Sequence, residues 1–153
     1  MDCSRCRIIG QIASFAALDP ADRWLAVRAI SLTLLFRAAL WVAPFPAVRA
    51  LADRRLARAP GHRTSDRWPL AVRAAVTRAR RTVPWSSCLV SALVAEWLLR
   101  DGRHPCRLTI GVAPDGDSPL DAHAWVESGR WLVTGDGALE RYRPLVAFST
   151  PAR

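Results

Sequence analysis

The pattern of apolar residues changes near residue 83, and this change limits the chain to a mixed fold. Before it, the apolar residues recur at helical spacing in three segments: one from Pro20 to the prolines at 44 and 46, one over 46–59 and one over 68–81. After it, one more helical segment is followed by three short runs of strand character: 106–113, 122–127 and 130–134. A helical part followed by one helix and an antiparallel sheet predicts an α+β fold.

Local signals mark where several of these elements begin and end. Asp19 precedes Pro20 and Asp22, a pattern typical of a helix start: a capping acceptor, a first-turn proline and a first-turn carboxylate. Two serines precede the central helix, and Gly102 is expected to end it. The Ser128–Gly129 dipeptide has the length of a tight hairpin turn between the second and third strands.

The length of 153 residues favours one domain, large enough to bury about 70% of its unfolded surface. No linker separates two independent units. We therefore expect a single domain over 1–153, in which residues 1–82 form a helical N-terminal part and residues 83–153 form the core.

The 22 basic residues are all arginine, and against 13 acidic residues they give a formal net charge of +9. They are spread along the whole chain, with a mild concentration at 49–81, and few aromatic residues alternate with them. This distribution argues against nucleic-acid binding, while an acidic protein or peptide partner suits the charge.

Residues 24–48 are the most apolar segment, but Arg28 and Arg37 interrupt it before it reaches the roughly 20 apolar residues of a membrane span. We interpret it as a buried or surface-docking helix and expect no integral membrane segment. The first ten residues lack the pattern of a signal peptide, which favours the cytoplasm.

Four cysteines do not predict a disulfide framework in a chain of this size without a secretion signal. Cys3 and Cys6 form a C-x-x-C pair, but no second pair with zinc spacing follows, so we expect no metal and no cofactor. Cys106 and Trp97 are expected in the core, and Trp85 is expected to pack, with a role of its indole as an oxyanion donor as the alternative.

Cys88 lies at the start of the central helix, after two serines. There a thiolate faces unpaired amide hydrogens and the positive end of the helix dipole, which favour the anion. The same amides can bind the oxyanion of an acyl-transfer intermediate. Position alone leaves open a second interpretation, in which Cys88 is a small buried residue that begins an apolar helix.

His123 alternates along its strand with Asp121, Trp125 and Glu127 on one face. A lone strand histidine is more often structural than catalytic. Here, however, a helix-start cysteine precedes it, and Asp136 follows just past the next strand. Cysteine, histidine and acid in this order form the triad of papain-like and transglutaminase-like enzymes.

The segments "CLVSALVAEWLLRDGRHPCRLTIGV", "AHAWVE" and "ERYRPL", with the opening "LDPADRWLAVRAISLTLLFRAALWVAPFP", resemble the transglutaminase-like cysteine peptidases of lasso-peptide biosynthesis. The resemblance spans about residues 15–147 and suits the stand-alone form of these leader peptidases. It implies a papain-like core in which a central helix packs on a small antiparallel sheet. It also implies three partners: the lasso precursor peptide, a small leader-recognition protein and an asparagine-synthetase-like cyclase.

By motif, the resemblance makes Cys88 the nucleophile and His123 the base. Asp136 is assigned as the third member by position, with Glu127 and Asp121 as alternatives. The arginine-rich segment 49–81 is ordinarily a solvated face; as a hypothesis, it docks the leader peptide or the leader-binding partner.

Two other functions fit the same residues. A transglutaminase-like acyltransferase or deamidase would use the same triad, since only the acyl acceptor differs. A non-catalytic scaffold that binds the precursor or the cyclase would need neither the cysteine nor the histidine.

Overall fold

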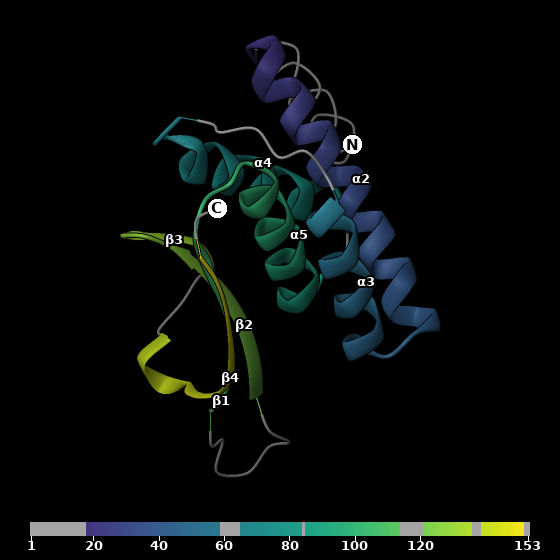
Figure 1. Ribbon diagram of the computed structural model, residues 1–153, viewed down its shortest axis with the longest axis vertical. Helices are drawn as coiled ribbons and strands as arrows, with labels where there is room; N and C mark the ends of the chain where they lie inside the picture. The colour runs from purple at the N-terminus through teal and green to yellow at the C-terminus, as the bar shows by residue number, and fades with distance from the viewer. Residues whose placement is uncertain (1–17, 59–64, 84, 114–120, 136–138, 152–153) are drawn as a thin grey trace, which may run out of the picture.

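The predicted α+β architecture is confirmed by the computed structural model, in which helices lie against one face of a four-stranded sheet (Figure 1). The structure describes residues 18–58, 65–83, 85–113, 121–135 and 139–151. Our predictions for Cys3, Cys6 and Asp136 fall outside these described residues.

Four helices are described, and their bounds agree with the sequence pattern to within a few residues: α2 (Pro20–Val42), α3 (Phe45–Arg58), α4 (Trp68–Thr82) and α5 (Cys88–Asp101). The first three form the predicted helical part. The fourth is the central helix, which packs against the other helices and against the first three strands.

The start of α2 follows the predicted position but not the predicted bonding. Asp19 is the N-cap residue of α2, yet its side chain makes no capping hydrogen bond. The prediction that its carboxylate accepts a hydrogen bond from the first turn is therefore wrong. At α5 the cap is present, because the hydroxyl of Ser87 accepts a hydrogen bond of 3.2 Å from the amide of Val90. The serines before the central helix therefore define where it begins.

The C-terminal end of α5 lies where the sequence predicts it. Gly102 is the C-cap, but its φ is −77°, so it does not use the left-handed conformation that favours glycine. Arg103 adopts it instead, with a φ of 58°. The amide of His104 then donates to the carbonyl of Leu99 at 2.9 Å, which closes the helix as in a Schellman motif.

The sheet is antiparallel, with the strand order β3-β2-β1-β4, and its strands are β1 (Cys106–Ala113), β2 (Asp121–Ser128), β3 (Trp131–Thr134) and β4 (Arg143–Thr150). The hairpin between β2 and β3 is confirmed, and Gly129 turns it with a φ of 56°. Strand β4 was not predicted; it follows a short 3-10 helix, η1 (Leu139–Arg141), and pairs with β1.

The core lies between α5 and the sheet, with α2 and α4 covering the other side of α5. Cys106 is buried there, as expected. Trp97 packs against the core with its ring edge-on to Phe36, at 5.9 Å between centroids, which also agrees with expectation. The N-terminal end of α5 lies next to the start of β2, where Cys88 contacts Ala122.

Within the described part of the chain, one helix, α2, has the length and apolar composition of a membrane span. Its Leu25, Ala29 and Phe36 are buried in the core of the domain. Such a segment agrees with the expectation of a buried or surface-docking helix.

Candidate functional site

Cys88 is the first residue of α5 and is partly buried. Its Sγ lies 3.9 Å from the carbonyl oxygen of Ala122, the residue before His123. Among the described residues, no hydrogen-bond partner occupies the amides of Cys88 and Leu89, whereas Ser87 satisfies those of Val90 and Ser91. The thiol therefore sits at a helix end that still offers two amide donors.

His123 lies near the start of β2, paired with Gly111 of β1. Its ring stacks on Trp125 at 6.5 Å and on Tyr142 at 5.1 Å between centroids, with interplanar angles of 21° and 27°. Its Nε2 is buried, and no hydrogen-bond partner for it lies in the described part of the chain. Buried polar atoms are nearly always satisfied, so this unpartnered nitrogen is an exception among the buried side chains.

Tyr142 is the chain's single tyrosine and was not singled out from the sequence, although it lies within "ERYRPL". Its hydroxyl donates a hydrogen bond of 2.8 Å to the Oδ2 of Asp121, and an Arg141 nitrogen lies 3.3 Å from the same oxygen. The Asp121 carboxylate raises the pKa of Tyr142, and burial and the charge of Cys88 act in the same direction. Tyr142 therefore joins the neighbourhoods of His123 and Cys88.

The three acidic candidates for the third member lie in different places. Asp121 shares the face of His123, but its carboxylate is bonded to Tyr142 and Arg141. Glu127 is exposed and lies four residues further along β2, about 13 Å from His123 at the rise of a strand. Asp136 lies outside the described residues.

Gly135, the residue before Asp136, packs against Trp125 of β2, the strand that carries His123. Gly135 adopts a φ of 111°, and a Cβ placed on it would overlap the Cβ of Trp125. Only glycine permits both the conformation and this close approach. The backbone that leads to Asp136 therefore passes against Trp125, whose ring stacks on His123.

Trp85 does not pack as expected. It is 82% exposed and has a left-handed φ of 63°, although it precedes Cys88 by only three residues. The Arg37 guanidinium donates a hydrogen bond of 2.6 Å to its carbonyl oxygen. An arginine of α2 thus holds the loop that leads to Cys88, and this loop presents a large aromatic ring to solvent.

Cys106 is chemically unlike Cys88. Burial, helped by the negative charge of Glu96, raises the pKa of the Cys106 thiol to about 12. It stays protonated at neutral pH and belongs to the core. No group of three histidine, cysteine or acidic side chains in the described ranges is arranged to hold a metal ion.

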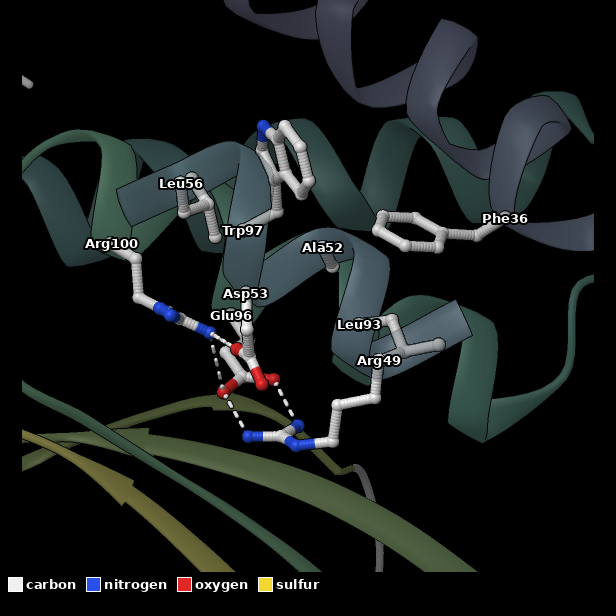
Figure 2. Close-up of a pocket in the computed structure, with 9 residues that line it drawn as sticks. All are labelled: Phe36, Arg49, Ala52, Asp53, Leu56, Leu93, Glu96, Trp97 and Arg100. Carbon is white, nitrogen blue, oxygen red and sulfur yellow. Dashed lines mark hydrogen bonds and ion pairs between the residues drawn. The ribbon is translucent and has the colours of Figure 1, made fainter. Parts of the chain in front are cut away.

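A cavity between α3 and α5 has apolar walls and an ionic floor (Figure 2). Phe36, Leu93 and Trp97 line it, and Arg49 and Glu96 pair at its base. Its volume of about 10 Å³ holds at most one water molecule. It is a packing defect above a buried ion pair rather than a ligand site.

A larger, open groove of about 800 Å³ runs between α3 and the end of β4. Phe45 and Phe148 form its apolar part. Phe148 is six residues beyond Tyr142, about 20 Å along an extended strand, so this groove is separate from the thiol site.

The comparison with protein families agrees with this arrangement. A family model described as the transglutaminase-like superfamily matches residues 31–147, which is most of the chain. The chain belongs to the transglutaminase-like superfamily. The matched region includes α3, α4 and the entire thiol site, so the superfamily unit extends well into the helical part.

No curated protein and no solved structure shows significant similarity to the chain. The superfamily is compatible with a peptidase or an acyltransferase. Membership therefore places the chain among proteins whose fold suits acyl-transfer chemistry at a cysteine, and the choice between these reactions depends on the acyl acceptor.

Proposed function

We propose that this protein is a cytoplasmic cysteine peptidase that removes the leader peptide from a lasso-peptide precursor. In this proposal it acts with a separate leader-binding protein and an asparagine-synthetase-like cyclase. The observation that carries the chemistry is the position of Cys88, at the N-terminal start of α5 and against the residue before His123. The sequence resemblance to lasso leader peptidases supplies the substrate class.

The proposed reaction has two steps. The Cys88 thiolate attacks the carbonyl carbon at the leader–core junction, and the oxyanion accepts hydrogen bonds from the free amides at the start of α5. His123, protonated in the ion pair with Cys88, gives its proton to the leaving amine of the core peptide. Water then attacks the thioester that holds the leader, and His123 accepts a proton from that water.

The surroundings of His123 support its role as the base. Trp125 and Tyr142 stack on the imidazole and limit its rotation, and Nε2 lacks a partner among the described residues. We assign Asp136 to orient the ring and stabilise its cation, because it directly follows Gly135, which packs on Trp125. Asp121 instead holds Tyr142 through its hydroxyl.

The decisive experiment incubates the protein with a candidate precursor and its leader-binding partner and follows leader release by mass spectrometry. We expect release from the native protein and none from Cys88→Ala or His123→Ala. Cys106→Ala is the matched control for the cysteine, since it removes a buried sulfur and leaves the site intact. Release that persists in Cys88→Ala contradicts the mechanism.

The same assay separates hydrolysis from acyl transfer. With a primary amine such as putrescine present, a peptidase gives a free leader carboxylate, whereas an acyltransferase gives a leader or glutamine side chain that carries the amine. Loss of ammonia without chain cleavage would identify a deamidase. Three further variants, Asp136→Asn, Asp121→Asn and Glu127→Gln, identify the third member; we expect only the first to abolish release.

A further inference from the structure

One face of α2 is exposed along its whole length and is apolar, although the opposite face is buried. Its residues follow one another at intervals of three and four. We call this set the α2 seam: Trp24, Val27, Ser31, Leu34, Ala38 and Trp41. Trp24, Leu34 and Trp41 are 60%, 53% and 83% exposed. Figure 1 shows α2 running along the outside of the helical layer, so no described element covers the seam.

Alternating intervals of three and four are those of the a and d positions of a coiled coil. From Trp24 to Trp41 the seam is about 26 Å long, which is nearly five helical turns. Small residues, Ser31 and Ala38, stand between larger ones and allow a second helix to approach closely. A bilayer would gain nothing from small residues at these places, because it has no side chains to fit between the larger ones.

The charges beside the seam indicate what kind of helix fits it. Arg23, Arg28 and Arg37 occupy flanking positions, and no acidic residue of α2 does. Asp101 of α5 pairs with Arg28 at 2.9 Å, whereas Arg37 donates to a backbone carbonyl and keeps its full charge. The Arg28 guanidinium lies 4.7 Å from the Trp24 ring centroid, and that of Arg37 lies 5.9 Å from the Trp41 ring centroid. In a parallel pair of two copies, Arg23 of one copy would face Arg28 of the other, and each copy carries a net charge of +9.

We propose that the α2 seam docks an apolar helix with acidic flanking residues, carried by a partner protein. Flanking carboxylates would complement the positive charge that Asp101 leaves uncompensated beside the seam, and large apolar side chains would fill the spaces at Ser31 and Ala38. The proposal does not rest on the peptidase activity. Docking at the seam would nevertheless reach the proposed peptidase site. Arg37, beside the seam, also binds the carbonyl of Trp85, so an occupied seam ends at the loop before Cys88.

The experiment uses the full chain and two synthetic helical peptides of about four heptads. Both carry leucine at the a and d positions; one has glutamate at all flanking positions, and the other has lysine. We expect the acidic peptide to bind saturably, as measured by fluorescence anisotropy, and at least about tenfold more tightly than the basic one. Equal binding of the two peptides, or none, overturns the proposal.

Single substitutions locate the binding. Leu34→Glu changes an exposed position and should weaken the binding of the acidic peptide about tenfold or more, because it places a carboxylate in the middle of the seam. Leu145→Glu is the matched control, since Leu145 is 68% exposed on β4 and should leave binding unchanged. Circular dichroism confirms that both variants fold. Equal effects of the two variants on peptide binding would overturn the assignment of the binding site to the α2 seam.

Two further measurements test the other possible occupants of the seam, a membrane surface and a second copy of the chain. Co-sedimentation with phosphatidylglycerol vesicles that depends on Leu34, without peptide binding, would show that the seam meets a membrane surface and would overturn the proposal. Sedimentation velocity of the free chain that shows a dimer lost in Leu34→Glu would show that a second copy covers the seam, and would overturn it as well. A monomer that ignores vesicles and binds the acidic peptide supports it.

Discussion

Replacing Glu96 by alanine should destabilise the protein far more than the loss of an ordinary surface ion pair. Glu96 lies in α5 with only 3% of its surface exposed. Both of its carboxylate oxygens accept hydrogen bonds from Arg49 of α3, at 2.8 and 2.9 Å, and Arg100 lies 3.6 Å from one of them (Figure 2). Arg100 in turn pairs with Asp53.

The expected magnitude follows from what the substitution leaves behind. Without Glu96, the largely buried Arg49 loses both of its hydrogen bonds to a carboxylate, and Arg100 keeps its pair with Asp53, which is partly exposed. Removing one partner of a buried pair costs about 3–5 kcal/mol, because the other charge stays buried without compensation. That is a large part of the roughly 5–15 kcal/mol that stabilises a domain.

The assay is urea unfolding followed by circular dichroism. Arg141→Ala is the control, since its pair with Asp121 is about half exposed and should contribute less than about 1 kcal/mol. The double variant Arg49→Met with Glu96→Leu removes both charges and should cost less than Glu96→Ala alone. The reasoning is refuted if Glu96→Ala costs no more than Arg141→Ala.

Four other predictions have defined outcomes. Gly135→Ala should lower the unfolding free energy by about 3 kcal/mol, from its φ of 111° and the overlap with Trp125; an unchanged urea midpoint would contradict this. Arg103→Gly should raise it by about 1 kcal/mol, because Arg103 is left-handed at φ 58°; no gain means that the side chain compensates. Iodoacetamide at pH 8 should label Cys88 but not Cys106, whose pKa is raised to about 12, as peptide mapping would show; equal labelling contradicts the burial argument. The Cys106 thiol should also make stability fall as the pH rises above about 9, since the unfolded thiol ionises there first.

The helical half of the fold could be predicted because its signals are local. Helical spacing of apolar residues, prolines near 44 and serines before Cys88 each act within one or two turns, and the observed bounds agree with them. The predictions that failed concern the two helix ends, where the outcome depends on side-chain and backbone conformation. Asp19 stands at the cap position without bonding, and the left-handed residue is Arg103 rather than its glycine neighbour.

Strand β4 was missed because its residues carry no alternating pattern. Most of it is exposed, it lies at the edge of the sheet, and its pairing with β1 shifts register at Gly111 beside Pro144. An edge strand with one partner is specified by that partner and not by its own sequence. Only the long-range pairing shows that residues 143–150 belong to the sheet.

In the candidate site, too, the residues with local sequence signals were predicted, and the residue that depends on long-range strand pairing was missed. Cys88 and His123 have local signals, a helix start and an alternating strand, and the fold brings their elements together. Tyr142 has none, because it reaches His123 only through the pairing of β4 with β1. The acidic member remains a prediction from chain order.

The position of Arg37 connects the two proposals. On one side its guanidinium lies by Trp41 at the end of the α2 seam, and on the other it holds the carbonyl of Trp85. Trp85 is kept exposed in a left-handed conformation three residues before Cys88, a strained geometry that costs about 1–3 kcal/mol and needs support from its surroundings. Because Arg37 supplies that support, a partner that displaces it from Trp85 would alter the approach to the thiol without touching the thiol itself.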